Sequence, residues 1–359
     1  MQKYDHGGDV YGAVCPVLDF SISLNPMGPP PEVLEAAGEA LFHWNRYPDP
    51  RCRALRRATA LREKVPEEFL LFGSGASDLI HRFLRARRPK QAILLAPTFS
   101  EYRRGLEEGH CKIQEYFLGK EEGFSVSRGL LDLIRPGVDL VFLCDPNNPT
   151  GRSMERTLLV EILRRCRAVG AFLAVDQCFL ELTEGDRETL VPELEGGGLM
   201  LFRALTKNYA LAGLRLGYCL CGERELLDRM EGLGAPWPVS VPAQAAGEAA
   251  FQKAPDWPRR ALAFLAEERT KVTCALENLG LWVCPSDANF LLVQGPVDLG
   301  DRLLREARIL LRDCANYSGL GPGWYRIGLQ GREDNTCLIQ AMERILSEGG
   351  ERVCRPRPL

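Results

Sequence analysis

The sequence predicts an α/β fold in which a mostly parallel β-sheet is covered by helices on both faces. Two observations support this fold class. Short apolar runs, which are typical of buried strands, alternate with longer amphipathic stretches along most of the chain. The chain has 359 residues, of which 45% are hydrophobic and 26% are charged, so it is long enough to bury a large core without disulfide bonds.

Seven apolar runs define the expected strands. Helical periodicity is clearest in residues 78–86 and 154–169, which lie between such runs. Strands that alternate with helices form βαβ units, and ligands of such sheets bind at the carboxyl ends of the strands. The runs cover residues 68–73, 91–96, 113–118, 138–144, 171–175, 198–203 and 216–221.

The pattern changes at residues 235–242, where the segment APWPVSVP is rich in proline. We expect one long helical stretch over residues 243–279, then short strands, then a last helix over 333–346. This layout predicts a second, smaller α+β domain. The expected division is an N-terminal arm over residues 1–45, a large domain over 46–240 and a small domain over 241–359. The short strands are expected at residues 282–285, 288–294, 308–313 and 324–328.

Composition argues against several classes of function. The net charge of −3 gives no overall positive field of the kind that binds nucleic acid. No apolar stretch approaches the ~18 residues that a membrane-spanning helix needs. The 13 cysteines and 4 histidines are dispersed, with no spacing typical of a metal site, so no metal is expected. Reduced thiols and the absence of a signal-peptide pattern at the N-terminus predict a cytoplasmic protein.

Four polar residues follow predicted strands. Each alone has an ordinary structural explanation: a turn asparagine, a helix-capping aspartate, or a surface lysine or arginine. Their joint position at strand ends of one sheet points instead to a shared site. They are Asn148 in PNNPTG, Asp176 after AFLAV, Lys207 in LTKNYALAGLR, and Arg215 eight residues later.

Pyridoxal phosphate chemistry needs this combination. A lysine amine bonds to the aldehyde of the cofactor, and a carboxylate keeps the pyridine nitrogen protonated so that the ring accepts electrons. An amide holds the phenolic oxygen, and backbone N–H groups at a helix start bind the phosphate together with an arginine. The glycine-rich turn at residues 73–77, directly before a predicted helix, suits that phosphate.

With these motifs the chain resembles the fold-type I aminotransferase superfamily over nearly its whole length. The resemblance implies a large domain with a mostly parallel seven-stranded sheet between helices, a smaller α+β domain, and pyridoxal 5′-phosphate as cofactor. It implies that Lys207 bonds the cofactor, that Asp176 pairs with the pyridine nitrogen and that Asn148 holds the phenolic oxygen. The phosphate ligands implied by the resemblance are Gly75, Ala76, Ser77, Thr206 and Arg215.

Two aromatic residues complete the resemblance. Phe99, in APTFSEY, matches the residue that stacks on the cofactor ring. Tyr47, in RYPDP, matches the tyrosine that reaches the cofactor phosphate of a neighbouring subunit, which implies a homodimer with shared active sites. The chain departs from the common pattern at Phe179, where many members have a tyrosine, and at Ala204, where a serine is usual. The ring oxygen and the phosphate would each lose one hydroxyl contact.

Within the superfamily, the chain is most similar to the L-threonine O-3-phosphate decarboxylases of cobalamin synthesis. The segments that carry this likeness are HGG at 6–8, DFSISLNPMG at 19–28, and LRDCANYSGL at 311–320 followed by WYRIG. The likeness implies decarboxylation of a small phosphorylated amino acid. An aminotransferase of the histidinol-phosphate type is the alternative, because the sequence does not show which bond of the substrate is turned out of the cofactor plane and broken.

Candidate substrate ligands come from both ends of the chain. Arg312 and Arg326 flank the CANY segment, and each can bind an oxyanion through two N–H groups. We expect one to bind the substrate phosphate and one the carboxylate, with Arg326 favoured for the carboxylate; alternatively, one of them forms a surface ion pair. The resemblance adds Asn148, a lid segment formed by His6 and Gly7, and Asn25 in the extended arm.

Overall fold

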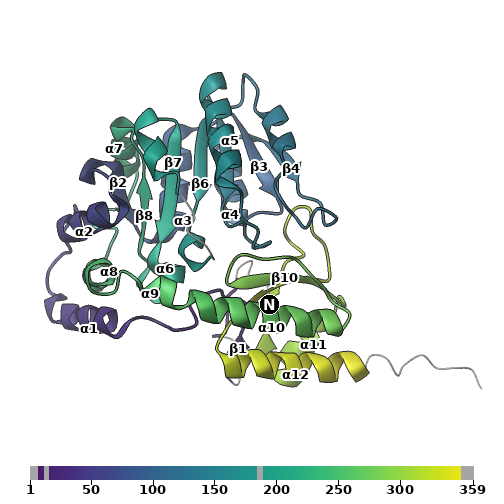
Figure 1. Ribbon diagram of the computed structural model, residues 1–359. Coiled ribbons are helices and arrows are strands. Elements are labelled where there is room, and N and C mark those ends of the chain that lie inside the picture. Colours follow the sequence, from purple (N-terminus) through teal and green to yellow (C-terminus); the bar gives the residue numbers. More distant parts are fainter. Residues whose placement is uncertain (1–6, 12–15, 184–188, 349–359) are drawn as a thin grey trace, which may run out of the picture.

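The computed structural model describes residues 7–11, 16–183 and 189–348, and its centre is a seven-stranded sheet (Figure 1). The strand order is β2-β8-β7-β6-β5-β3-β4, and β8 runs antiparallel to both of its neighbours. The strands β3 to β7 are parallel to one another, which confirms the predicted α/β class. The bounds are β2 Leu70–Gly73, β3 Gln91–Ala96, β4 Lys112–Phe117, β5 Leu140–Cys144, β6 Phe172–Asp176, β7 Leu199–Ala204 and β8 Gly217–Leu220.

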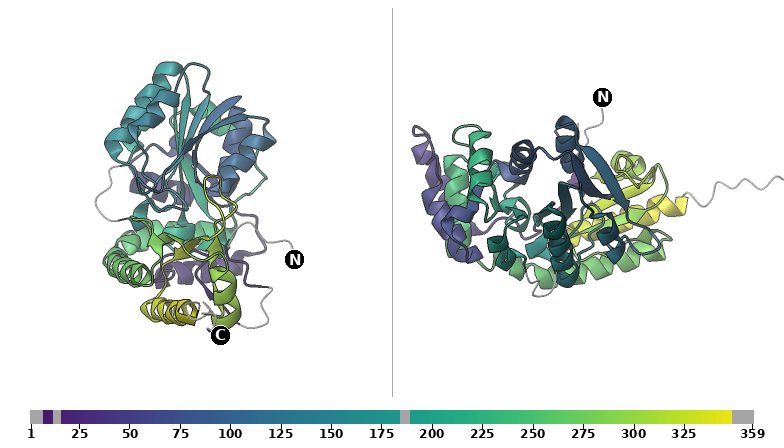
Figure 2. Two further views of the ribbon diagram at one scale, coloured as in Figure 1. Left: turned by 90° about the vertical axis from the view of Figure 1, so that its right-hand side faces the viewer. Right: turned by 90° about the horizontal axis from the view of Figure 1, so that it is seen from above.

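Successive side chains along each strand point to opposite faces of the sheet, so the hydrophobic core is divided into two layers. In β5, Val141 and Leu143 belong to one layer, whereas Phe142 and Cys144 belong to the other. Helices α2, α5 and α8 cover the first face, and α3, α4 and α7 cover the second, so that the sheet lies between helices (Figure 2). The bounds are α2 Arg53–Glu63, α3 Gly75–Arg87, α4 Ser100–Glu108, α5 Arg156–Val169, α7 Arg224–Gly232 and α8 Val241–Lys253.

The C-terminal part forms a smaller antiparallel sheet in the order β12-β13-β10-β9. Helices α10 and α12 pack beneath it and share a second hydrophobic core with it (Figure 1). This arrangement confirms the predicted smaller α+β unit. The bounds are β9 Trp282–Val283, β10 Phe290–Gln294, β12 Arg312–Asp313, β13 Trp324–Gly328, α10 Leu262–Asn278 and α12 Arg332–Glu348; the short helices are α1 Pro31–Glu39, α6 Leu205–Asn208, α9 Trp257–Arg260 and α11 Leu299–Arg302.

Two predictions for this part of the chain were wrong. The single helix expected over residues 243–279 is three helices, α8, α9 and α10. Pro255 disfavours helical backbone at the residue before it, so α8 ends at Lys253, and Pro258 stands in the first turn of α9. The strand expected over 308–313 is divided into β11 (Ile309–Leu310) and β12, which belong to different sheets.

The N-terminal arm joins the smaller unit. Strand β1 (Leu18–Asp19) pairs in parallel with β11, and the side chain of Phe20 is buried in the second core. The Phe20 amide also donates to the Leu310 carbonyl at 2.9 Å. The domain limits at residues 45 and 240 stay a prediction.

Candidate active site

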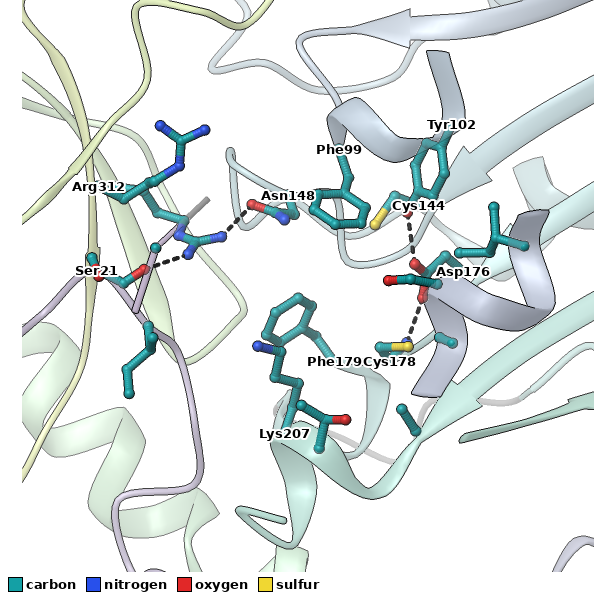
Figure 3. Close-up of a pocket in the computed structure, with 18 of the residues that line it drawn as sticks. Ser21, Phe99, Tyr102, Cys144, Asn148, Asp176, Cys178, Phe179, Lys207 and Arg312 are labelled. Carbon is teal, nitrogen blue, oxygen red and sulfur yellow. Dashed lines mark hydrogen bonds between the residues drawn. The ribbon is translucent and has the colours of Figure 1, made fainter. Parts of the chain in front are cut away.

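A pocket lies where the carboxyl ends of β5, β6 and β7 face the smaller sheet and the arm (Figure 3). Its lining brings together most of the residues that the sequence predicts, although they are spread along the chain from Gly7 to Arg326. The predicted residues found in the lining are Gly7, Ala76, Ser77, Phe99, Asn148, Asp176, Thr206, Lys207, Arg215, Arg312 and Arg326.

Asp176 is the last residue of β6, and its carboxylate is buried at the floor of the pocket. Its Oδ2 accepts a hydrogen bond from the Tyr102 hydroxyl at 2.7 Å, and its Oδ1 accepts one from the Cys178 amide at 3.0 Å. A buried carboxylate held on both oxygens can present its charge to a protonated ring nitrogen with little freedom to move.

Lys207 follows β7 in the short helix α6, and its side chain extends into the pocket toward Phe179 (Figure 3). Burial and the nearby positive charge of Arg326 lower the pKa of Lys207 from 10.5 to about 8. An amine with this pKa has an appreciable neutral fraction near neutral pH. Only the neutral form attacks an aldehyde, so the environment favours the covalent role predicted for this lysine.

The phosphate-binding candidates surround the start of α3. Gly75 begins this helix with φ +82°, and a Cβ built at this glycine would lie 2.8 Å from Arg215 Nη2. Glycine therefore lets the Arg215 guanidinium approach the helix start, where backbone N–H groups bind anions. Ala76, Ser77 and Thr206 line the same end of the pocket.

Asn148 is fixed by Arg326, whose Nη1 donates to Asn148 Oδ1 at 2.6 Å. This bond orients the amide so that its Nδ2 group is the donor that remains for the phenolic oxygen of a cofactor. The preceding residue, Asn147, ties the turn to the loop before α4, because its Nδ2 donates to the Pro97 carbonyl at 2.9 Å and its Oδ1 accepts from Thr98 Oγ1 at 2.8 Å. Phe99 is thereby placed beside the turn.

The two substrate arginines lie opposite each other on neighbouring strands. Arg312 in β12 and Arg326 in β13 are paired residues of the antiparallel ladder, so both side chains leave the same face of the sheet. Arg326 Nη2 also donates to the Ser21 carbonyl at 2.8 Å, and Arg312 Nη2 donates to Asn316 Oδ1 at 3.0 Å. Two buried guanidinium groups at one mouth of the pocket suit a substrate with two anionic groups.

The arm supplies another wall of the pocket. Gly7 packs on the backbone of Ser21 so closely that a Cβ on it would lie 2.2 Å from the Ser21 carbonyl oxygen. The Gly8 amide donates to Ser21 Oγ at 2.8 Å, and that hydroxyl donates to Asp19 Oδ1. His6, the other predicted lid residue, lies outside the described residues.

Three predicted residues stand outside the pocket lining. Gly75 lies directly behind it, at the helix start. The side chain of Asn25 is buried against the lysine segment: its Nδ2 donates to the Asn208 carbonyl at 2.9 Å, and its backbone amide donates to the Lys207 carbonyl at 2.8 Å. Tyr47 is 78% exposed and stacks on Trp237 at 4.2 Å between ring centroids. The predicted roles of Asn25 and Tyr47 stay predictions.

Several lining residues were not predicted from the sequence. Tyr102 and Cys178 contact the Asp176 carboxylate, Cys144 ends the neighbouring strand β5 beside it, and Ser21 contacts Arg326. Tyr317, in the CANY segment, lies under the Arg312 guanidinium at 5.2 Å. The sequence could have indicated two of them. Tyr102 follows Phe99 by three residues, and Tyr317 lies in the segment LRDCANYSGL that carries the resemblance to the decarboxylases.

The residues of this pocket fit pyridoxal phosphate. A cradle that a Cβ would fill lies at Gly75, a buried carboxylate lies at Asp176, and an amine with a lowered pKa lies at Lys207. Within the described ranges, no group of three or more histidine, cysteine, aspartate or glutamate side chains is arranged to hold a metal ion. No described helix has the length and apolar character needed to cross a bilayer.

Comparison with known proteins agrees with this geometry. The chain matches the family described as aminotransferase class I and II over residues 16–345. It is 34% identical to threonine-phosphate decarboxylase of Salmonella typhimurium over 353 residues, which cover 95% of this chain and 96% of that protein. It is 29% identical to histidinol-phosphate aminotransferase 2 of Archaeoglobus fulgidus, over 92% of this chain and 93% of that one.

A solved structure shares the fold. The histidinol-phosphate aminotransferase of Clostridium acetobutylicum superimposes with a TM-score of 0.85 at 24% identity and covers 92% of this chain and 100% of that one. Members of the family use pyridoxal phosphate, in accordance with the pocket described above. The sequence match, the shared fold and the placement of Lys207, Asp176 and Asn148 show that the chain belongs to the class I and II aminotransferase family.

Proposed function

We propose that this protein decarboxylates L-threonine O-3-phosphate to (R)-1-amino-2-propanol O-phosphate and CO2, as a step of cobalamin synthesis. The identity of 34% to a threonine-phosphate decarboxylase over nearly the full length of both chains supports the choice of reaction. The observation that carries the proposal is the pair of facing arginines, Arg312 and Arg326, above the lysine. They provide separate sites for the two anionic groups of this substrate.

Bound by these residues, pyridoxal phosphate would supply an electron sink for the bond at the α-carbon that breaks. The protein residues prepare that step. Asp176 holds its negative charge at the pocket floor, and Arg326 and Arg312 orient the two substrate anions. After CO2 leaves, the α-carbon needs a proton, and Lys207 Nζ, which lies in the pocket lining, would deliver it.

The alternative is an aminotransferase of the histidinol-phosphate type. Its support is the 29% identity to the Archaeoglobus fulgidus enzyme, since the Clostridium acetobutylicum structure at 24% identity shows the fold alone. Phe179 packs edge-on against Phe290 at 4.9 Å and lies 5.6 Å from Lys207 Nζ, so no phenol hydroxyl is supplied at this position. The apolar pair beside the lysine favours the decarboxylase.

One experiment separates the two reactions. The purified enzyme, loaded with pyridoxal phosphate, is incubated with L-threonine O-3-phosphate while CO2 and the amino-propanol phosphate are measured. In parallel it is incubated with histidinol phosphate and 2-oxoglutarate while glutamate is measured. Stoichiometric CO2 release without glutamate supports the proposal, whereas glutamate formation without CO2 contradicts it.

We further propose a cytoplasmic homodimer with shared active sites. The exposed side chains Phe42, Trp44 and Tyr47, at 87%, 70% and 78%, lie close together in the sequence and give an apolar surface that a second copy would cover. Tyr47 would then reach the cofactor phosphate of the partner. The eleven cysteines in the described ranges are free thiols, which suits a reducing compartment. Light scattering should give twice the chain mass of 40.0 kDa.

A further inference from the structure

Tyr102 contacts the Asp176 carboxylate from helix α4, which covers the same face of the sheet. It lies in α4, is fully buried, and its hydroxyl donates to Asp176 Oδ2 at 2.7 Å (Figure 3). The alternation of side chains between the two faces of β6 explains this contact. Asp176 shares its face of the sheet with Phe172 and Ala174, and that face is covered by α3 and α4.

Packing fixes the position of this hydroxyl. The Tyr102 ring stacks on Phe142 at 4.2 Å with an interplanar angle of 21°, and it meets the edge of Phe99 at 5.6 Å and 79°. A ring held between two aromatic side chains cannot turn its hydroxyl away from Asp176 without disturbing the core. One side chain therefore touches both the predicted ring-stacking residue and the predicted partner of the ring nitrogen.

The hydroxyl is also held in its donor form. Burial and the negative charge of Asp176 raise the pKa of Tyr102 well above its ordinary value, so the phenol stays protonated across the working pH range. The other ionisable group that affects it is the buried Cys144 thiol, whose own pKa is raised by burial and by Asp176. The Tyr102 hydroxyl therefore remains the donor of its hydrogen bond to Asp176.

We propose that Tyr102 is a positioning residue of the cofactor site, which acts through Asp176 on the protonated nitrogen of the ring. The hydroxyl holds Oδ2 while the Cys178 amide holds Oδ1, so the carboxylate keeps one orientation. A carboxylate held on both oxygens stays aimed at one place in the pocket, where the protonated ring nitrogen would lie. This inference rests on the cofactor site and not on the choice of substrate.

The test compares Tyr102→Phe with a matched control, Tyr218→Phe. Tyr218 is also buried and donates to a carboxylate, Glu63 Oε1, at 2.6 Å, but it lies outside the pocket lining. We expect Tyr102→Phe to lower kcat about 10- to 100-fold with less than a twofold change in KM, and to weaken cofactor binding several-fold. Tyr218→Phe should leave kcat and cofactor affinity unchanged within about twofold, whatever it does to thermal stability.

Two further measurements identify the route of the effect. With a cofactor analogue that carries carbon in place of the ring nitrogen, cofactor affinity should be the same for Tyr102→Phe and the parent. In an Asp176→Asn background, Tyr102→Phe should cause little additional loss of cofactor affinity, since the two residues act as one unit. Equal losses of affinity for both cofactors, or additive effects in the double variant, would overturn the proposal. These affinity measurements need no substrate, so they decide the question even if the parent enzyme fails to release CO2.

Discussion

The two halves of the pocket are built in different ways. The cofactor half comes from one sheet, where Asp176 ends strand β6 and Asn148 and Lys207 follow the neighbouring strands β5 and β7. The substrate half is assembled from the antiparallel pair β12 and β13 and from the arm, which meet through bonds between residues 305 positions apart. Chemistry on the cofactor is therefore set by local strand geometry, whereas substrate choice depends on long-range contacts.

The largest effect is expected in the cofactor half, from Lys207→Ala. The variant should lack a cofactor linkage that borohydride can reduce, and turnover should fall by about 10³-fold or more, because both the covalent bond and the proton donor are lost. Mass spectrometry after reduction and CO2 release measure the two effects. Lys120→Ala is the control, since Lys120 Nζ bonds Gln294 away from the pocket. Near-normal activity of Lys207→Ala would remove the cofactor assignment.

A second variant of the same half, Asp176→Asn, should keep the cofactor but lose rate. Removing the charge opposite the ring nitrogen weakens stabilisation of the electron pair, and we expect kcat to fall about 100- to 1,000-fold. Stopped-flow absorbance would show whether substrate still binds at the parent rate. A kcat within twofold of the parent would contradict the pairing of Asp176 with the ring nitrogen.

The substrate half should behave differently, because we propose that its arginines bind the anionic groups of the substrate. Arg312→Ala and Arg326→Ala should each lower kcat/KM by about 30- to 150-fold, from ~2–3 kcal/mol for a lost charge-assisted contact, with an intact cofactor spectrum. Loss of the arginine that binds phosphate should reduce discrimination between threonine phosphate and threonine. We expect that result for Arg312, and equal losses on both substrates for Arg326. Changes below twofold for both variants would place the substrate elsewhere.

The smallest expected effect links the halves through pH. The pKa of Lys207 is lowered to about 8, so the neutral amine fraction, and with it the rate of cofactor uptake by the apoenzyme, should rise as pH increases through about 8. Arg326→Gln removes one of the charges that lowers this pKa and should move the midpoint upward. Stopped-flow measurements between pH 6.5 and 9.5 test this; an identical midpoint in the variant would show that Arg326 does not act on the lysine.

The same contrast explains what the sequence could predict. Asn148, Asp176 and Lys207 lie at the carboxyl ends of strands, as predicted, because the end of a parallel strand is visible in a local sequence pattern. The cross-strand pairing of Arg312 with Arg326 could not be predicted, since a spacing of fourteen residues does not specify the register of two strands. Tyr102 was missed for a related reason. From the sequence, an aromatic residue on an amphipathic helix is interpreted as part of the hydrophobic core. Only the fold shows that the Tyr102 hydroxyl donates to a carboxylate.

The main error in the fold also has a local cause. Residues 243–279 are rich in residues that favour helices, but Pro255 and Pro258 interrupt the helical backbone. Helix-favouring composition does not show that a helix is continuous, and the two prolines mark where the chain breaks.

The arm segment at Ser21 to Asn25 forms hydrogen bonds to both halves of the pocket and links them directly. At one end, the Ser21 carbonyl accepts from Arg326 of the smaller sheet; at the other end, the Asn25 amide and side chain donate to the backbone of Lys207 and Asn208. The Leu24 carbonyl, next to Asn25, also accepts from Asn289 Nδ2 beside β10 at 2.9 Å. Contacts to the smaller unit and to the lysine segment therefore fall on adjacent residues of the arm, so a rotation of the smaller sheet over the pocket must break one of these bonds or move the lysine segment with it.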